Sequence, residues 1–311
     1  MELIEGVALS ELCDYSFGDQ SGQWGNIYTS FMKDANLLNT EFASKAFEVR
    51  KERDCMTLFV DNIRLYKRDI AEVKPEDRAY VNSLMETSDV LSLCRHYEGV
   101  KFIIFTNLED TPTDEYIFKA IPENVLCISA VNAIANGGKV VPAPYGVQRR
   151  MNPHDDRKEQ LERMMSNIFP TPTYPLYINH NDNSHEERIG LKDLFRSWAT
   201  VEDQRVNYTN FLLNLARHKF VLSPRGNAID CHRHWEVLYM RRVPVMKRDP
   251  YLEELFRGYP VLFVDKYSDI NKDLLLENEY LFQQAQKMDL KGLTLRGFFD
   301  NIINGFAPVN G

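Results

Sequence analysis

The chain has 311 residues, of which 44% are hydrophobic and 26% charged, and its formal net charge is −8. This composition excludes a disordered, collagen-like or fibrous protein, and the acidic balance excludes a general nucleic-acid binder, so an anionic ligand would need a local basic pocket. No apolar run approaches the ~20 residues that span a bilayer, and the N-terminal residues lack a signal-peptide pattern. The sequence therefore predicts a cytoplasmic globular enzyme with neither a membrane span nor a nucleic-acid partner.

Short apolar segments alternate with longer amphipathic segments along the chain. The predicted strands are residues 56–60, 101–106, 125–130, 175–179, 220–223, 243–246 and 260–264. The helix-period segments between them are residues 76–97, 155–168 and 189–198, and the tail predicts two more helices over residues 271–287 and 292–306. Because strands alternate with helices, the sequence predicts βαβ units and parallel sheets, which is an α/β fold.

A proline-rich segment marks a predicted domain boundary. Three prolines within residues 168–175 disfavour both a helix and a central strand. The predicted domains are residues 1–168 and residues 169–285, with residues 286–311 as a helix that packs back on the first domain.

The loop after the strand at residues 219–223 is the predicted ligand-binding loop. The chain has no Gly-x-x-x-x-Gly-Lys loop, and no Gly-x-Gly-x-x-Gly follows a strand, so a nucleotide would need another loop. Pro224 and Gly226 break the strand, and Asp230 is the predicted N-cap of a helix that runs to about residue 241. This loop follows the carboxyl end of a parallel strand, where open α/β sheets bind ligands.

Three side chains of this loop and helix suit a nucleotide. A helix N-terminus favours phosphate, and Arg225 and Arg233 are predicted to converge on a diphosphate with bidentate hydrogen bonds. Glu236 follows Arg233 by three positions, hence on the same helix face, and is predicted to accept both hydroxyls of a ribose. The alternative is that Arg233 and Glu236 form a surface ion pair and that Arg225 is merely exposed.

Residues 220–245, FVLSPRGNAIDCHRHWEVLYMRRVPV, resemble the donor-binding signature of exostosin-like glycosyltransferases. In that family a Pro-Arg-Gly loop precedes an Arg-x-x-Glu-Ala-Leu helix and an Ile/Val-Pro-Val strand; Val237 stands where the family often has Ala. The further matches are residues 176–181, Glu187-Arg188, residues 198–200, residues 260–264 and Asp269-Ile270. The resemblance covers residues 174–275 well and the first half of the chain only loosely.

The resemblance implies a GT-B fold, in which two Rossmann-like domains face each other across a cleft, and inverting transfer of a sugar from a UDP-sugar without a metal. The donor-binding residues that it implies are Arg188, Arg225, Gly226, Arg233 and Glu236, together with Asn181 and His232. Positively charged side chains beside the diphosphate would lower the barrier to sugar transfer, because negative charge develops on the diphosphate as it leaves. The acceptor would be a hydroxyl of an oligosaccharide, a lipid-linked glycan or a glycoprotein. A GDP-sugar transferase and a non-catalytic binding protein on a degenerate GT-B fold remain as alternatives.

The first domain should supply the acceptor site and the general base that inverting transfer needs. Residues 13–25 contain three glycines and form a predicted loop, in which Asp19 is the first candidate base and Asp14 the second. Tyr15 and Trp24 are predicted to stack on the acceptor sugar. The alternative is that both aspartates cap turns of an ordinary loop.

A second candidate loop and the histidines complete the predicted site residues. Tyr145 and Arg149 are predicted to line the cleft, with a plain surface turn as the alternative. His232 and His234 lie two residues apart on a helix and point to different sides, so no metal site is expected. His180 is predicted to lie in a solvated polar loop. The nucleotide sugar is a substrate, and no permanently bound cofactor is expected.

Overall fold

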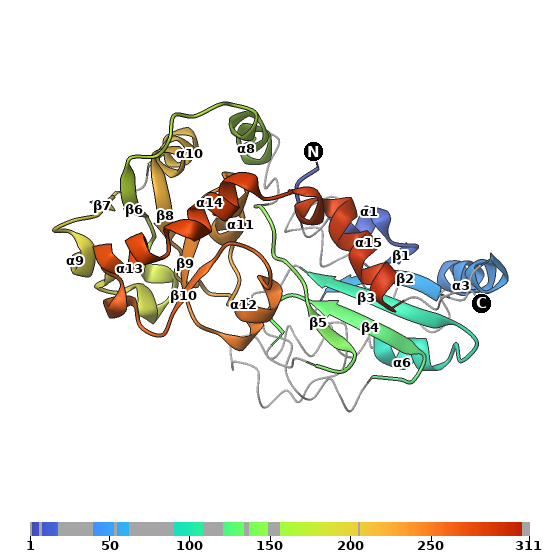
Figure 1. The fold of residues 1–311 in the computed structure, drawn as a ribbon. Coiled ribbons are helices and arrows are strands. Elements are labelled where there is room, and N and C mark those ends of the chain that lie inside the picture. The colour runs from blue at the N-terminus through green and yellow to red at the C-terminus, as the bar shows by residue number, and fades with distance from the viewer. Residues whose placement is uncertain are drawn as a thin grey trace. The chain divides into compact units, whose positions relative to one another are not determined.

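The computed structural model describes residues 2–5, 8–17, 40–52, 55–61, 90–107, 121–133, 137–148, 156–204 and 206–306. Its chain divides into two compact units, a first unit of Glu2–Tyr145 with Leu293–Gly311 and a second unit of Gly146–Gly292. Among the described residues, each unit contains a five-stranded parallel sheet (Figure 1). The predicted α/β class with parallel sheets is therefore confirmed.

The first sheet follows the order of the chain. Its strands are β1 (Tyr15–Ser16), β2 (Cys55–Asp61), β3 (Lys101–Asn107), β4 (Val125–Ala130) and β5 (Val140–Pro142), and they lie in the order β1-β2-β3-β4-β5. Every neighbouring pair is parallel. β2, β3 and β4 match predicted strands, whereas β1 and β5 are too short to show a period in the sequence.

Helices cover both faces of the first sheet. They are α1 (Leu9–Leu12), α3 (Thr40–Glu52), α6 (Val90–Arg95) and α15 (Leu295–Phe306). On β3, Phe105 stacks on Phe299 of α15 with ring centroids 5.0 Å apart, while Phe102 stacks on Phe42 of α3 at 6.3 Å. Since Phe102 and Phe105 lie an odd number of residues apart on one strand, the two helices cover opposite faces. Figure 1 shows α1 beside α15.

The two ends of the chain complete the first unit. Leu3 forms a β-bridge with Thr294, and the amide of Leu295 donates to the carbonyl of Glu2 at 3.0 Å. The sequence predicted a boundary at residues 168/169; the division between the units falls at residues 145/146, so α8 (Arg157–Met165) and the proline-rich segment belong to the second unit.

The second sheet reverses the direction in which strands are added. Its strands are β6 (Tyr174–Ile178), β7 (Thr200–Val201), β8 (His218–Leu222), β9 (Val243–Lys247) and β10 (Leu262–Val264), in the order β10-β9-β8-β6-β7. Counted within the unit, this is the doubly wound order 2-1-3-4-5, and all its pairs are parallel. The reversal falls between β6 and β8, and ligands bind at the carboxyl ends of strands at such a switch point.

Helices of the second unit enclose its core. Besides α8 they are α9 (Leu191–Phe195), α10 (Tyr208–Arg217), α11 (His232–Tyr239), α12 (Pro250–Leu255), α13 (Lys272–Glu277) and α14 (Glu279–Lys287). The single helix predicted over residues 271–287 is two helices, because Asn278 ends α13 and its side-chain amide donates to the carbonyl of Leu274 at 2.8 Å. Among the described residues, none of the helices has the length and apolar character that crossing a membrane requires.

Candidate functional site

A cavity of about 960 Å³ lies at the carboxyl ends of β6 and β8 in the second unit. Residues 179–183, which follow β6, form part of its wall, and residues 231–236, where α11 begins, provide Cys231, His232, Arg233 and Glu236. Tyr208 and Phe211 of α10 contribute another part. The volume is in the range of small-molecule and cofactor sites, and the position is the switch point of the sheet. We therefore treat this cavity as the candidate functional site.

The start of α11 is fixed by a buried charged pair. Asp230 was the predicted N-cap, but Cys231 holds that position and Asp230 lies before it. The Asp230 carboxylate instead accepts hydrogen bonds from Nδ1 of His234 at 2.9 Å and from Nε1 of Trp235 at 2.8 Å. Both Asp230 and His234 are fully buried. The prediction was wrong by one residue, because the Asp230 carboxylate bonds to the side chains of His234 and Trp235 in the first turns of the helix.

His234 has hydrogen-bond partners at both ring nitrogens. Its Nε2 donates to the carbonyl of Ser223 at 3.1 Å. Its Nδ1 lies 2.9 Å from the Asp230 carboxylate and 3.3 Å from the amide nitrogen of Cys231. Burial by itself lowers the pKa of His234, but the neighbouring Cys231 and the hydrogen bond to Asp230 raise it to about 10. The resulting ion pair ties the loop after β8 to α11.

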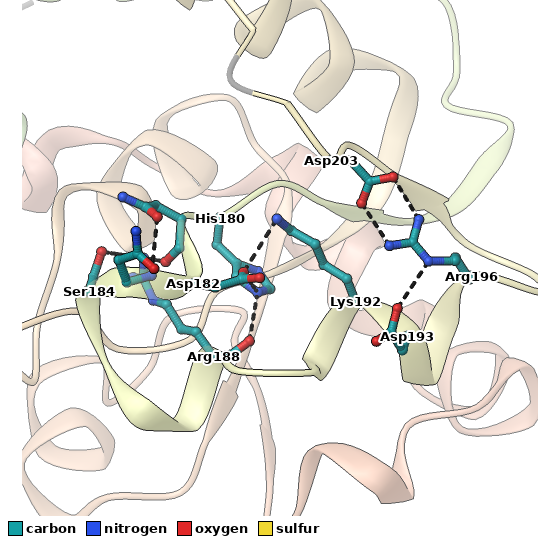
Figure 2. Close-up of polar contacts among 10 residues, drawn as sticks. His180, Asp182, Ser184, Arg188, Lys192, Asp193, Arg196 and Asp203 are labelled. Atoms are coloured by element: carbon teal, nitrogen blue, oxygen red, sulfur yellow. Dashed lines mark hydrogen bonds and ion pairs between the residues drawn. The ribbon is translucent and has the colours of Figure 1, made fainter.

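Arg188 joins the two loops that border the cavity. Its guanidinium donates to the carbonyl of Arg225 at 2.7 Å and of Pro224 at 2.9 Å, both in the loop after β8. It also donates to the carbonyl of Asn181 at 3.2 Å and to the hydroxyl of Ser184 at 3.3 Å, in the loop after β6 (Figure 2). Arg188 was predicted to neutralise a diphosphate. In the structure most of its N–H groups hold the protein backbone, while its charge stays beside the cavity.

Arg233 and Glu236 lie on one face of α11 and line the same cavity. The Arg233 guanidinium carbon lies 5.2 Å from the ring centroid of Phe211, and its Nη1 is buried without a hydrogen-bond partner among the described residues. Glu236 is 7% exposed, and its carboxylate accepts a hydrogen bond from Tyr208 Oη at 2.9 Å. Such burial does not suit a surface ion pair of these two residues.

Arg225 lies in a different cavity. It lines a space of about 100 Å³ with Lys247 and Arg248, and its Nη2 donates to the carbonyl of Asn227 at 3.4 Å. The structure therefore does not bring Arg225 and Arg233 to one cavity, although the sequence predicted that they converge. Gly226 follows Arg225, and a Cβ at Gly226 would lie 3.4 Å from Nη2 of Arg188.

Two other predicted donor residues, Asn181 and His232, line the large cavity. The Asn181 side chain accepts from the amide of Asn183 at 3.1 Å and so caps the 3-10 helix η4 (Asp182–Ser184). His232 Nδ1 donates to the carbonyl of Gly146 at 2.8 Å. Both residues thus combine a structural bond with a position at the cavity wall.

His180 is a lining residue that the sequence placed in a solvated loop, and that prediction was wrong. It is 5% exposed and lines the cavity. Burial is the largest cause that lowers its pKa to about 4, and the charges of Arg233, Arg188 and Lys192 lower it further. Its position two residues after the buried strand β6 was the signal in the sequence.

The cavity wall carries both signs of charge. Arg157, Arg188, Lys192 and Arg233 stand against the carboxylates of Asp182, Asp203 and Glu236. Lys192 pairs with Asp182 at 3.3 Å, and Arg196 holds Asp203 through two hydrogen bonds of 2.7 Å (Figure 2). A cationic excess beside many amide and hydroxyl groups suits a ligand that combines an anionic group with hydroxyls.

Of the residues predicted for the acceptor side, Asp14, Tyr15 and Tyr145 belong to the first unit. Asp19, Trp24 and Arg149 lie outside the described residues. Asp14 precedes β1, at the amino end of that strand, and its Oδ2 accepts from the amide of Thr57 at 2.8 Å and from its hydroxyl at 2.9 Å. These bonds tie β1 to β2 and give Asp14 a structural role.

The predicted acceptor aromatics differ in what surrounds them. The Tyr15 ring contacts Phe17 and Phe42 edge to face at 5.1 and 5.3 Å, so it takes part in an aromatic cluster. Tyr145 is half-buried at the end of the first unit. In the part of the chain that the structure describes, no group of three or more His, Cys, Asp or Glu side chains could hold a metal ion.

A comparison with protein-family models and with curated proteins finds no match for this chain. The chemistry of the cavity and the sequence around it are therefore what indicates a function. What the structure defines is an α/β protein with two parallel sheets and a polar cavity at the switch point of the second sheet.

Proposed function

We propose that this protein is an inverting glycosyltransferase of the GT-B type, which transfers a sugar from a UDP-sugar to a hydroxyl of a glycan acceptor. One observation carries the proposal: Arg233 and Glu236 lie on one face of α11 and line a cavity of about 960 Å³ at the switch point of the sheet. The resemblance of residues 220–245 to the exostosin-like donor signature gives this pair its roles.

The donor would lie with its diphosphate at the N-terminus of α11. There Arg233 has an unpartnered Nη1, and the helix N-terminus favours an anion. Glu236, whose carboxylate is held by Tyr208, would accept the ribose hydroxyls. Arg188 would keep the loops after β6 and β8 in place and add positive charge near the leaving group. Arg225 does not line this cavity, so we assign it no direct contact with the diphosphate.

The other parts of the proposal combine the resemblance with predictions made from the residues of this chain. The transfer would proceed without a metal, in the cytoplasm, on an oligosaccharide, a lipid-linked glycan or a glycoprotein. Asp19 remains the first candidate for the general base that takes the proton of the acceptor hydroxyl. UDP-xylose and UDP-hexoses are the donors to test first.

Isothermal titration with UDP tests the donor site. Arg233→Ala should weaken UDP binding about 10- to 100-fold, because hydrogen bonds to charged groups contribute about 1.5–3 kcal/mol. Arg225→Ala should change it less than about threefold, and so should Arg257→Ala, an exposed arginine of the same unit. Equal affinity of wild type and Arg233→Ala would remove the site assignment.

Turnover separates the remaining alternatives. A panel of UDP- and GDP-sugars, with hydrolysis of the donor as readout, should show release of UDP from one of the UDP-sugars. Competition of GDP with UDP at equal strength would favour a GDP-sugar donor. Binding without any turnover across the panel would favour a non-catalytic protein on the same fold.

A further inference from the structure

Tyr208 holds one oxygen of the Glu236 carboxylate at the wall of the large cavity. Its hydroxyl donates to Oε1 of Glu236 at 2.9 Å, and both residues line the cavity. The bond joins the first residue of α10 to the middle of α11. A structural role alone would explain such a contact between two helices, unless the carboxylate also offers its second oxygen to a ligand.

The second oxygen of Glu236, Oε2, is accessible. Glu236 is 7% exposed, and among the described residues Tyr208 alone donates to its carboxylate. Oε2 therefore has no donor in this part of the chain. It does not belong to the fully buried polar atoms that lack a partner, so it keeps accessible surface. A carboxylate oxygen accepts hydrogen bonds and has none to give, so Oε2 suits a hydroxyl of a ligand and not a phosphate.

The Tyr208 ring is fixed by groups of two helices. The side chain of Asn207 accepts from the amide of Asn210 at 2.8 Å, so α10 begins at Tyr208. The ring stacks on Phe211 with centroids 5.9 Å apart, and the guanidinium carbon of Arg157 lies 5.6 Å from its centroid. Arg157 belongs to α8, which lies beside α10 (Figure 1). A donor fixed in this way holds the carboxylate in one orientation.

We propose that Tyr208 is a positioning residue of the donor site, whose bond to Oε1 directs Oε2 of Glu236 at one hydroxyl of the ribose. The inference rests on the proposed function, in which Glu236 accepts from the ribose of UDP. It narrows that role, because Tyr208 already occupies one of the two oxygens that were predicted to accept both hydroxyls. The site would then select a ribonucleotide over the deoxy form that lacks this hydroxyl.

Three ligands separate positioning from a structural role: UDP, 2′-deoxy-UDP and 3′-deoxy-UDP. Isothermal titration measures their affinities for the wild type and for Tyr208→Phe, which removes the hydroxyl and keeps the ring beside Phe211 and Arg157. Tyr280→Phe is the matched control, because Tyr280 is an exposed tyrosine of the same unit.

We expect the wild type to bind UDP at least about tenfold more tightly than one of the two deoxy forms, because a hydrogen bond to a charged group is lost. In Tyr208→Phe this ratio should fall to about threefold or less, since UDP binds more weakly while that deoxy form binds as before. Tyr280→Phe should keep the wild-type ratio. Glu236→Gln should lower the ratio as well, and adding Tyr208→Phe to it should weaken UDP binding by less than about twofold, because both changes remove one interaction.

An unchanged ratio in Tyr208→Phe would overturn the inference, even if all three ligands bind more weakly, because the contact would then only join α10 to α11. Equal affinity of the wild type for all three ligands, or additive losses in the double variant, would overturn it as well. In each of these cases UDP still binds to the wild type, so the proposed function stands. If the wild type binds no UDP, the proposed function fails and the inference fails with it.

Discussion

The two sheets of this protein are built from the same parallel βαβ units but differ in the order of their strands. In the first sheet the order β1-β2-β3-β4-β5 follows the chain, so the described strands are added in one direction. In the second, the chain adds β7 on one side of β6 and then β8 on the other. Loops diverge where the direction reverses, and the cavity of about 960 Å³ lies there. The strand order thus decides where this fold makes room for a ligand.

The units also differ in how the chain closes them. The second unit is one continuous stretch, Gly146–Gly292, whereas the first needs residues from both ends of the chain. The two units also differ in where their polar side-chain contacts lie. Asp14 and Thr57 connect strands near the amino end of β1, while Arg188 and the Asp230–His234 pair hold the loops at the carboxyl ends of the second sheet. We infer that these buried polar groups of the second unit fix the loops that border the cavity.

The largest expected effect follows from breaking the buried pair of the second unit. Asp230→Asn leaves the His234 imidazolium without its counter-charge and turns an amide N–H₂ toward either His234 or Trp235. The free energy of unfolding should fall by about 3–5 kcal/mol, because an uncompensated charge stays buried. Urea denaturation followed by tryptophan fluorescence measures this change.

Asp193→Asn is the matched control for that variant, since Asp193 pairs with Arg196 at the surface of the same unit. It should lower the free energy of unfolding far less than Asp230→Asn. A loss in Asp230→Asn no greater than in this control would mean that His234 is not held as a charged partner. The idea that a buried ion pair shapes the loop after β8 would then be wrong.

A second variant tests how the first unit is closed. Phe299 of α15 is 7% exposed and stacks on Phe105 of β3. Phe299→Ala should lower the free energy of unfolding by about 3 kcal/mol, since it removes a large side chain from the core. Asn301→Ala, an exposed change on the same helix, should leave it nearly unchanged.

Hydrogen exchange shows whether that effect stays in one unit. Amides of β3 and β4 should lose protection in Phe299→Ala, while those of β8 and β9 should keep it, because α15 packs on the first sheet. Equal loss of protection in both sheets would contradict the comparison of a discontinuous unit with a self-contained one.

Long buried strands were predictable from the sequence, and short ones were not. The apolar runs at residues 101–106 and 125–130 became β3 and β4, and the run at residues 220–223 lies within the buried segment that includes β8. β7 has two residues, and its place in the sheet comes from pairing with Tyr177 and Ile178 of β6. Two residues show no period, so tertiary pairing alone defines such a strand.

The candidate site was predictable in its location but not in the direction of its side chains. The break after β8 and the i, i+3 spacing placed Arg233 and Glu236 on one helix face, where the structure has them. Arg225 lies in an irregular loop, and no period relates its direction to that of Arg233. The pKa of His180 depends on the charges of Arg188, Lys192 and Arg233, which come from three other segments. Such convergence is a tertiary property.

The smallest expected effect is a pH dependence of the free energy of unfolding that distinguishes two buried histidines of the second unit, His180 and His234. In the unfolded chain both titrate near 6.5, whereas the folded pKa of His180 is about 4 and that of His234 about 10. Between pH 4 and 6.5 the unfolded chain binds a proton that folded His180 does not bind, so acidification lowers the free energy of unfolding. Well below pH 6.5 His234 is protonated in both states and adds no slope.

In His180→Gln the free energy of unfolding should therefore fall less steeply with acidification than in the wild type. Each proton changes this free energy by about 1.4 kcal/mol per pH unit, so the difference between the two proteins should grow to about 2 kcal/mol between pH 7 and pH 5. Urea denaturation at intervals of half a pH unit measures it. The carboxylates and His218, whose pKa burial also lowers, contribute equally to both proteins and cancel in the difference. An unchanged acid slope in His180→Gln would show that His180 titrates alike in the folded and the unfolded chain, so that burial and the neighbouring charges do not lower its pKa.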